Sequence, residues 1–483
     1  MLVQQNQTQG STGVTIESVI DSIFVPGTNA VGDASANANV NDPLIRIPKV
    51  REMGRDTEDF KECYVPKIVS IGPYYFGDPR FQLFEQRKPV FAMSLLSGNK
   101  EALSRLYNKL FEMVQELRSF YAKDSTTEFC DNVFTKMMLL DGCFILQCII
   151  LHGDFQKWIK PDFQHEWIKL EEIDLIHYRD FLLLENQIPF KVLTEVMKLL
   201  NKENHLEKMI QRYLKNAICV SPQKPKLQKW LTSILCLRFD QSLHVERPKL
   251  QEMHTKPDHL LHLLHILHTG KVKHSKICML IDHRCNFRNV SELVDLGIHF
   301  KPSDTRSFAY FVFSKGWWGF SPIVKLPPID VTDGTRARLL NLAAYENCSR
   351  DKDRWVSSYI SLLDSLIDDT ADVKLLRKAW VLQTYMGSDE EVSKLFNGIG
   401  KELFMNFGYT VVMQEIQSHY GSLRNRLLSQ LKHEYFRSPW AIFALLGALM
   451  ALLLTGVQTY YTIWSPKGTC DDLCMFLKRN HHL

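Results

Sequence analysis

The sequence predicts a mainly α-helical protein with a small antiparallel β meander and one C-terminal transmembrane helix. Three observations lead to this prediction. Apolar residues recur at three- and four-residue steps through most of the chain, short aromatic and β-branched runs lie between residues 297 and 326, and an uncharged stretch of 29 residues lies near the end. The first spacing indicates amphipathic helices, and short β-branched runs between turn residues are typical of strands.

The uncharged stretch covers residues 438–466. A helix from Trp440 to Trp464 would be about 37 Å long at ~1.5 Å per residue, enough to cross a hydrocarbon core of ~30 Å with some tilt. Ser438 is a natural N-cap and Pro439 a natural first helical residue, and the two tryptophans stand where aromatic belts lie. A buried core helix is the alternative, but such helices rarely stay uncharged for so long. We therefore predict a membrane anchor with these four residues at its ends.

Composition is ordinary for a globular protein. The 483 residues are 45% hydrophobic and 23% charged, and 58 Lys and Arg stand against 54 Asp and Glu. This net charge of +4 is too small and too scattered to indicate a nucleic-acid partner. Eleven cysteines without a dense spacing pattern indicate mostly free thiols in a reducing compartment.

The N-terminal end has no targeting signal of a familiar kind. It lacks a basic region followed by an apolar run, and no arginine precedes Arg46, which argues against secretory and mitochondrial signals. Residues 1–43 are rich in small polar residues and are predicted to be disordered. The expected organisation is then a disordered segment (1–43), a helical domain (44–437), the span (438–466) and a short tail (467–483).

Charges around the span suggest an orientation. Four basic residues stand shortly before it and three after it, so the positive-inside rule favours a cytosolic helical domain in a single-pass protein of the plasma membrane or an endomembrane. In the opposite orientation, the sequons at Asn289 and Asn347 would be glycosylation candidates. Both sequons would then lie outside the cytosol. The simpler explanation for the presence of these short motifs is that they occur by chance.

The first half of the ordered chain is predicted to be helical after an extended start. Residues 64–89 contain four prolines and two glycines among large apolar residues, which is typical of a turn-rich segment packed across helices. Apolar positions from 103 to 121 predict one helix, and residues 137–151 a core helix whose uncharged run of ten residues is too short to span. Residues 180–190 are interpreted as the end of a buried helix, with two more helices around 192–200 and 206–213.

The second half changes period and then returns to helices. Residues 220–258 are interpreted as a variable excursion, and the short runs 297–301, 307–314 and 321–326 as the antiparallel meander. Helices follow over 334–346 and 354–367. Ser388 and Glu391 form a capping box that opens another, and apolar positions from Met413 to Tyr435 predict a last helix that ends directly before the span.

Familiar catalytic motifs are missing, and we expect no enzyme activity and no cofactor. The nucleophile-elbow, phosphate-loop and zinc-protease patterns do not occur; GIGKE at 398–402 is interpreted as a helix interior or hinge. HLLHLLHILH at 259–268 resembles a metal site, but steps of three turn a helix by about 300°, so four histidines cannot converge. His274, Cys278, His283 and Cys285 match no familiar zinc spacing.

Three other features leave alternatives open. Glu85, Asp141 and Glu185 stand among apolar residues; two that converged could share acid and base roles, whereas helix caps or ion pairs are the commoner use. Cys470 and Cys474 could form a disulfide in a lumenal tail, become acylated or stay free. Small-residue pairs within the span, such as Ala444 and Ala448, allow a homo-oligomer through close helix approach.

Eight phrases stand out by their order and spacing: RIPKVREMGRDTEDFKECYVPKIVSIGPYYFGDPRFQLFEQRKP, MMLLDGCFILQ, LLLENQIPF, HLLHLLH, LPPIDVTDGTRARLLNLAAYE, LLDSLIDDTADVKLL, SDEEVSKLFNGIGKEL and YFRSPWAIFALLGALMALLLTGVQTYYT. Together they resemble one plant family, that of domain of unknown function 247, over roughly residues 44–464. The resemblance implies a largely helical plant protein, usually with one C-terminal span and no established enzyme activity. Some grass members act in self-incompatibility. Members commonly have histidines after IGPY, where this chain has Tyr75 and Phe76.

These observations predict a membrane-anchored plant protein whose helical domain binds another protein, in recognition or signalling. A membrane-tethered enzyme with a carboxylate site and a trafficking adaptor at an internal membrane are the alternatives. Convergence of Glu85, Asp141 or Glu185 in a polar cavity would favour the enzyme, and separate pairing with basic residues would count against it.

Overall fold

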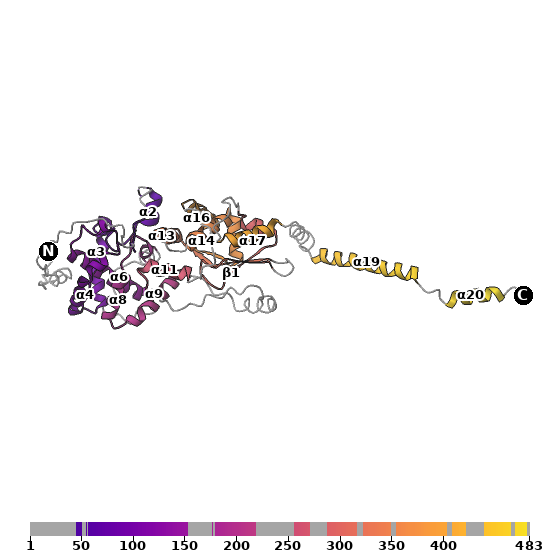
Figure 1. The fold of residues 1–483 in the computed structure, drawn as a ribbon, viewed down its shortest axis with the longest axis horizontal. Helices are drawn as coiled ribbons and strands as arrows, with labels where there is room; N and C mark the ends of the chain where they lie inside the picture. The colour runs from indigo at the N-terminus through magenta and orange to yellow at the C-terminus, as the bar shows by residue number, and fades with distance from the viewer. Residues whose placement is uncertain are drawn as a thin grey trace, which may run out of the picture.

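A computed structural model shows two packed groups of elements followed by two isolated helices (Figure 1). It describes residues 45–50, 55, 57–152, 176, 179–218, 256–270, 287–315, 322–348, 354–402, 408–421, 439–464 and 469–480. The predicted disordered segment, residues 220–255 of the predicted excursion, the His274 to Cys285 cluster and Ser438 lie outside these residues.

The first group is helical and is built around α6 (Asp131–His152). Helices α3 (Gln82–Leu95), α4 (Lys100–Glu112) and α8 (Phe190–Leu199) pack against α6. The other elements are α2 (Glu58–Tyr64), α5 (Val114–Arg118), α9 (Glu203–Ile218), α11 (Leu260–Thr269) and short 3₁₀ turns at Pro79–Phe81, Lys123–Ser125 and Asp180–Leu182.

Helix α6 confirms the prediction of a core helix. It is long and apolar enough to cross a membrane, yet 89% of its apolar window is buried within the protein. The predicted helix over 103–121 forms with its apolar face buried, but it breaks at Met113 into α4 and α5. Pro89, assigned to the turn-rich segment, instead lies inside α3.

The second group combines helices with two small sheets. Its helices are α12 (Val290–Asp295), α13 (Thr335–Cys348), α14 (Trp355–Leu366), α15 (Thr370–Lys378), α16 (Asp389–Glu402) and α17 (Thr410–Gly421). Its strands are β1 (His299–Pro302), β2 (Val312–Ser314), β3 (Ile323–Leu326), β4 (Ile329–Val331) and β5 (Leu382–Thr384). Buried side chains from both groups form one hydrophobic core.

The predicted antiparallel meander is wrong. The three-stranded sheet has the order β1-β3-β2, with β1 parallel and β2 antiparallel to β3, and β4 pairs with β5 in parallel. The chain after β1 does not turn straight back, because it first binds α11. The Phe308 amide donates to the His268 carbonyl (2.6 Å), and the Ser307 hydroxyl to the Thr269 carbonyl (2.8 Å). Strand β3 then enters between β1 and β2.

Residues 183–189 are not the end of a helix, contrary to the sequence interpretation. They run without regular structure beside the extended segment 66–72, and side chains join the two. The Asp180 carboxylate accepts hydrogen bonds from the Ile68 and Val69 amides (2.7 and 3.1 Å), and the Asn186 side-chain oxygen accepts one from the Ile71 amide (2.7 Å). These side chains take the place of a neighbouring strand, so the buried backbone groups are satisfied without a sheet.

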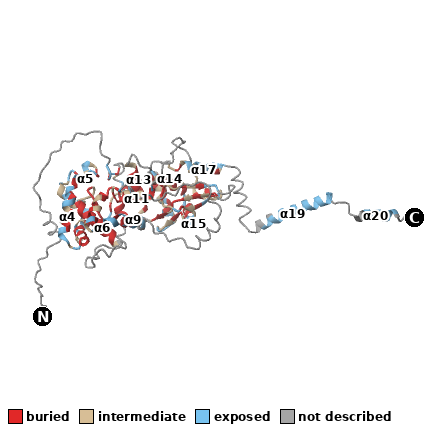
Figure 2. Ribbon diagram, turned by 60° about the horizontal axis from the view of Figure 1, so that its bottom comes forward, coloured by how far each residue is buried: buried red, intermediate tan, exposed pale blue. Residues whose placement is uncertain are grey.

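The last two helices stand apart from the packed groups. Helix α19 (Pro439–Trp464) is apolar and none of its membrane-length window is buried, and α20 (Thr469–Asn480) is exposed along its described side chains (Figure 2). Only α6 and α19 among the described helices are long and apolar enough to cross a membrane, a test of length and composition.

Candidate functional site

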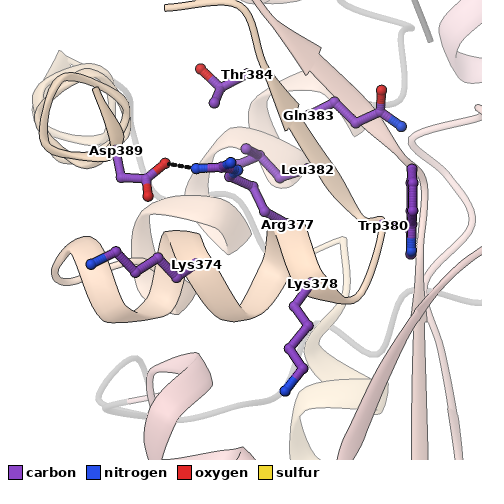
Figure 3. A pocket seen from close by; sticks show the side chains of 8 residues that line it. All are labelled: Lys374, Arg377, Lys378, Trp380, Leu382, Gln383, Thr384 and Asp389. Atoms are coloured by element: carbon purple, nitrogen blue, oxygen red, sulfur yellow. Dashed lines mark hydrogen bonds and ion pairs between the residues drawn. The ribbon is translucent and has the colours of Figure 1, made fainter. Parts of the chain in front are cut away.

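An open hollow of about 590 Å³ lies beside α15 on the described surface. Its walls are the C-terminal half of α15, the strand β5 that follows and the first residue of α16 (Figure 3). The lining residues are mostly charged or polar: Lys374, Arg377, Lys378, Trp380, Leu382, Gln383, Thr384 and Asp389.

Hydrogen-bonded caps fix both ends of α15. Asp369 caps its first turn and forms a capping box with Asp372. At the other end the Val381 amide donates to the Leu376 carbonyl (3.0 Å) and the Trp380 amide to the Arg377 carbonyl (2.9 Å), which is the Schellman arrangement. Helix α15 therefore stops in a tight turn that leads directly into β5.

Trp380 occupies an unusual position in that turn. Its φ is +61°, the left-handed conformation that glycine usually adopts at this point of a Schellman motif. An L-residue with a Cβ pays about 1–2 kcal/mol there, and such strain concentrates at functional sites. The indole is only partly buried and stands at the edge of the hollow (Figure 3).

The hollow carries a positive charge excess. The Arg377 guanidinium is paired with the Asp389 carboxylate at 2.5 Å. Lys374 and Lys378 are exposed, stand four residues apart on the same side of α15 and form no ion pair with a described residue. Two positive charges are thus left in the lining, and Figure 3 shows the Lys374 side chain at the opposite edge of the hollow from the Trp380 ring.

The lining of the hollow is mainly polar and charged. Small-molecule pockets are mainly apolar, whereas here only Trp380 and Leu382 are. The eight lining residues include no histidine, cysteine or serine, and the one hydroxyl, on Thr384, accepts a hydrogen bond from the Met386 amide at 3.1 Å. The arrangement can hold carboxylates or phosphates next to an apolar group.

The histidines of α11 are used as structural side chains. His259 caps the helix, its ring accepting from the His262 amide at 3.2 Å, and His265 lies 3.0 Å from the buried Glu346 carboxylate. The Tyr345 ring packs against the rings of His259, His262 and His265. No group of three or more potential ligands among the described residues is arranged to hold a metal ion.

His268 is separate from the other three. Its ring stacks on Phe308, with centroids 4.3 Å apart, and its Nε2 is buried without a hydrogen bond. Burial, assisted by the nearby charge of Arg338, lowers its pKa to about 3. A small cavity lies beside it, lined also by Arg306 and Asp330, so this histidine stays neutral in the folded protein at ordinary pH.

The three candidate carboxylates are each bound to a cation. Glu85 and Asp141 both contact the buried Lys88 ammonium, the second at 2.5 Å, and Asp141 also accepts from the Gly72 amide at 2.7 Å. Burial raises the pKa of Asp141 to about 6 despite this lysine. Glu185 lies in a different cluster.

The Glu185 cluster involves no other carboxylate from the predicted set. Its oxygens accept hydrogen bonds from the Val50 amide (2.7 Å), the Arg55 guanidinium and the Tyr75 hydroxyl (2.9 Å). Tyr75, where a histidine is expected from the family resemblance, therefore takes part in a partly buried hydrogen bond. Of the three carboxylates, the structure brings only Glu85 and Asp141 together, and it does so around one lysine.

Sequence reasoning missed the hollow beside α15. A usable signal was present: Lys374, Arg377 and Lys378 recur at helical spacing and Trp380 follows two residues later. The sequon asparagines were noted for glycosylation only. Asn289 is the N-cap of α12, where its side-chain oxygen accepts from the Glu292 amide at 2.9 Å.

Fold and hollow together define a mainly helical protein with a charged, open hollow and a long exposed apolar helix. The chain belongs to a plant protein family of unknown function, DUF247, whose family model matches residues 47–454. This confirms the resemblance seen in the sequence motifs.

Two relatives are Arabidopsis thaliana proteins of the UPF0481 group. One is 26% identical over 419 residues, which cover 84% of this chain and 83% of the relative. The other, described as a putative UPF0481 protein, is 27% identical over 478 residues, which cover 84% of this chain and 88% of the relative. No solved structure matches the chain.

Proposed function

We propose that this is a single-pass membrane protein whose packed helical part recognises an acidic segment of another protein. The observation that carries the proposal is α19, whose 26 residues include no charge and whose membrane-length window is not buried at all. A soluble monomer rarely exposes so large a contiguous apolar surface. Helix α6 passes the same test of length and composition but is covered by its own protein, whereas α19 needs another apolar medium.

Membrane attachment can be tested by alkaline extraction of plant microsomes that contain the full chain. Wild type should stay in the pellet, and the double variant Leu452→Arg/Leu453→Arg should be released, because each arginine at the centre of a span costs about 2.5–3.5 kcal/mol. Val411→Arg, at an exposed position of α17, is the matched control and should behave as wild type. Release of the wild type would refute the anchor.

The hollow beside α15 supports the recognition part of the proposal. Lys374 and Lys378 complement carboxylates of an acidic partner, and the partly buried indole of Trp380 offers an apolar contact in the same hollow. Tryptophan flanked by charges is typical of the few residues that supply most of the energy of a protein interface. Lysine charges at such a site chiefly set the association rate and the choice of partner.

Proximity labelling in plant tissue, with the biotin ligase fused to the full chain, tests recognition. Lys374→Glu/Lys378→Glu should remove a subset of labelled proteins, and the purified members of that subset should bind wild type but not the variant. Lys109→Glu/Lys208→Glu makes the same charge change at exposed positions of α4 and α9 and should leave the subset unchanged. An identical set of labelled proteins for all three chains would refute the role of the hollow.

The other hypotheses make different demands. An enzyme that used Glu85, Asp141 or Glu185 would need one of these carboxylates free to take a proton, and each is held by a cation in the structure. A trafficking adaptor would reside at an internal membrane, which imaging of the tagged full chain separates from a cell-surface protein. The excess of basic residues before the span favours a cytosolic helical part.

A further inference from the structure

Helix α20 has an apolar side that no part of the protein covers. Leu473, Phe476 and Leu477 stand three and four residues apart, and so share one side of the helix. Their exposed fractions are 60%, 64% and 53%. The whole described part of α20 is drawn as exposed in Figure 2.

The opposite side of α20 is charged. Asp472, Lys478 and Arg479 lie there, together with Met475. Both cations stand in the last turn of the helix. With 12 residues and three charges among the described side chains, α20 is too short and too polar to cross a membrane, which takes about 20 apolar residues.

The chain length between the two final helices limits where α20 can be. Only four residues, 465–468, separate Trp464 from Thr469. Five Cα-to-Cα steps reach at most about 18 Å at ~3.3–3.6 Å per residue, and α20 itself is about 18 Å long. If α19 spans a bilayer, α20 therefore starts no more than about 18 Å from the end of the span, within reach of the lipid surface.

We propose that α20 lies flat on the lipid surface beyond α19, with Leu473, Phe476 and Leu477 in the boundary between head groups and acyl chains. Lys478 and Arg479, on the polar side, then remain at the level of the head groups and the water. An apolar face with cations on the polar side is what interfacial helices share. A second copy of the chain is the less suitable cover, because specific interfaces bury about 1,000 Å² or more and three side chains supply far less. The proposal rests on α19 being the anchor.

The test uses the full chain in nanodiscs and a fluorescent amino acid, dansylalanine, placed at one position at a time. The lipids carry a nitroxide quencher either near the head group or near the chain end. We expect the probe at position 476 to emit at shorter wavelength and to be quenched about twofold more strongly than at 479, and mainly by the head-group nitroxide. A probe at position 453, in the middle of α19, should be quenched mainly by the chain-end nitroxide.

The outcomes separate this proposal from the anchor. Equal, weak quenching at 476 and 479 with strong quenching at 453 would overturn the interfacial position of α20 and leave the anchor intact. Weak quenching at 453 would overturn both. A short-wavelength probe at 476 that neither nitroxide quenches would mean that protein covers α20, and it would also overturn the proposal. In Leu473→Ser/Leu477→Ser, quenching at 476 should fall to the value at 479 while quenching at 453 stays.

Discussion

Replacing Gly72 by alanine tests the packing of the extended segment 66–72 against residues 183–189. Gly72 has φ +74°, and a Cβ added there would lie 2.6 Å from the Gln187 carbonyl oxygen. The left-handed conformation costs an alanine about 1–2 kcal/mol, and the forced shift of a packed main chain costs about 1–3 kcal/mol more. Gly72→Ala should therefore lower the free energy of unfolding by about 2–5 kcal/mol.

Gly77→Ala is the matched control for this variant. Gly77 has φ +85°, but nothing lies within 4 Å of its added Cβ, so only the conformational cost of about 1–2 kcal/mol applies. Urea unfolding of the full chain in detergent, followed by tryptophan fluorescence, measures both variants against wild type. The difference between them reports the close approach alone. Equal midpoints for the two variants would show that the segment is not held against Gln187 in the way described.

Three further variants test the buried polar groups and the hollow. Lys88→Met should lower the free energy of unfolding by about 3–5 kcal/mol in the same assay, because Asp141 is left buried without its cation. Lys191→Met breaks an exposed pair and should lower it by under ~1 kcal/mol. Similar losses for the two variants would refute the importance of the buried pair. The pKa of His268 lies below its unfolded value of about 6.5, so the unfolded chain binds this proton first and stability should fall on acidification below that pH, by up to about 1.4 kcal/mol per pH unit. The free energy of unfolding of His268→Phe should fall less than that of wild type at each pH below this value. Because Asp141 makes the same opposite contribution to both proteins between about pH 4 and 6, the comparison cancels it. Parallel stability curves for the two proteins would contradict the pKa shift of His268. Trp380→Gly should change stability by under ~1 kcal/mol, since relief of strain offsets lost packing, yet it should weaken labelling of the partner as Lys374→Glu/Lys378→Glu does.

Helical spacing predicted most helices well because each buries one side against a common core. The apolar positions that predicted α4, α8 and α9 lie in the core or pack against it, and Ser388 caps α16 by accepting from the Glu391 amide at 3.2 Å. The strands were harder to predict, since a three-residue strand has too few alternating positions to show its partner or direction. The order β1-β3-β2 depends on contacts of the β1–β2 connection with α11, which lies some forty residues earlier in the chain.

The partners of the buried polar side chains could not be predicted from the sequence either. A carboxylate among apolar residues, such as Asp141, is visible in the sequence, but its partner is not. Lys88 comes from α3, and the backbone donor Gly72 comes from an extended segment further back. The hollow beside α15 was missed for a related reason, because a left-handed tryptophan at a helix end cannot be distinguished by composition from one in a core.

The bonds between segment 66–72 and residues 180–187 also determine when the protein can finish folding. The amides of Ile68, Val69 and Ile71 bind side chains that follow 112, 111 and 115 residues later in the chain. At a synthesis rate of ~5–20 residues per second, the early segment waits roughly 5 to 20 s for these partners. Its backbone must stay hydrated meanwhile, since burial without partners is costly. The Cys63 carbonyl is synthesised still longer before its partner, because it accepts a hydrogen bond from the Asn341 side chain, which follows 278 residues later. The earliest ordered part of this protein is thus among the last to reach its native contacts on the ribosome.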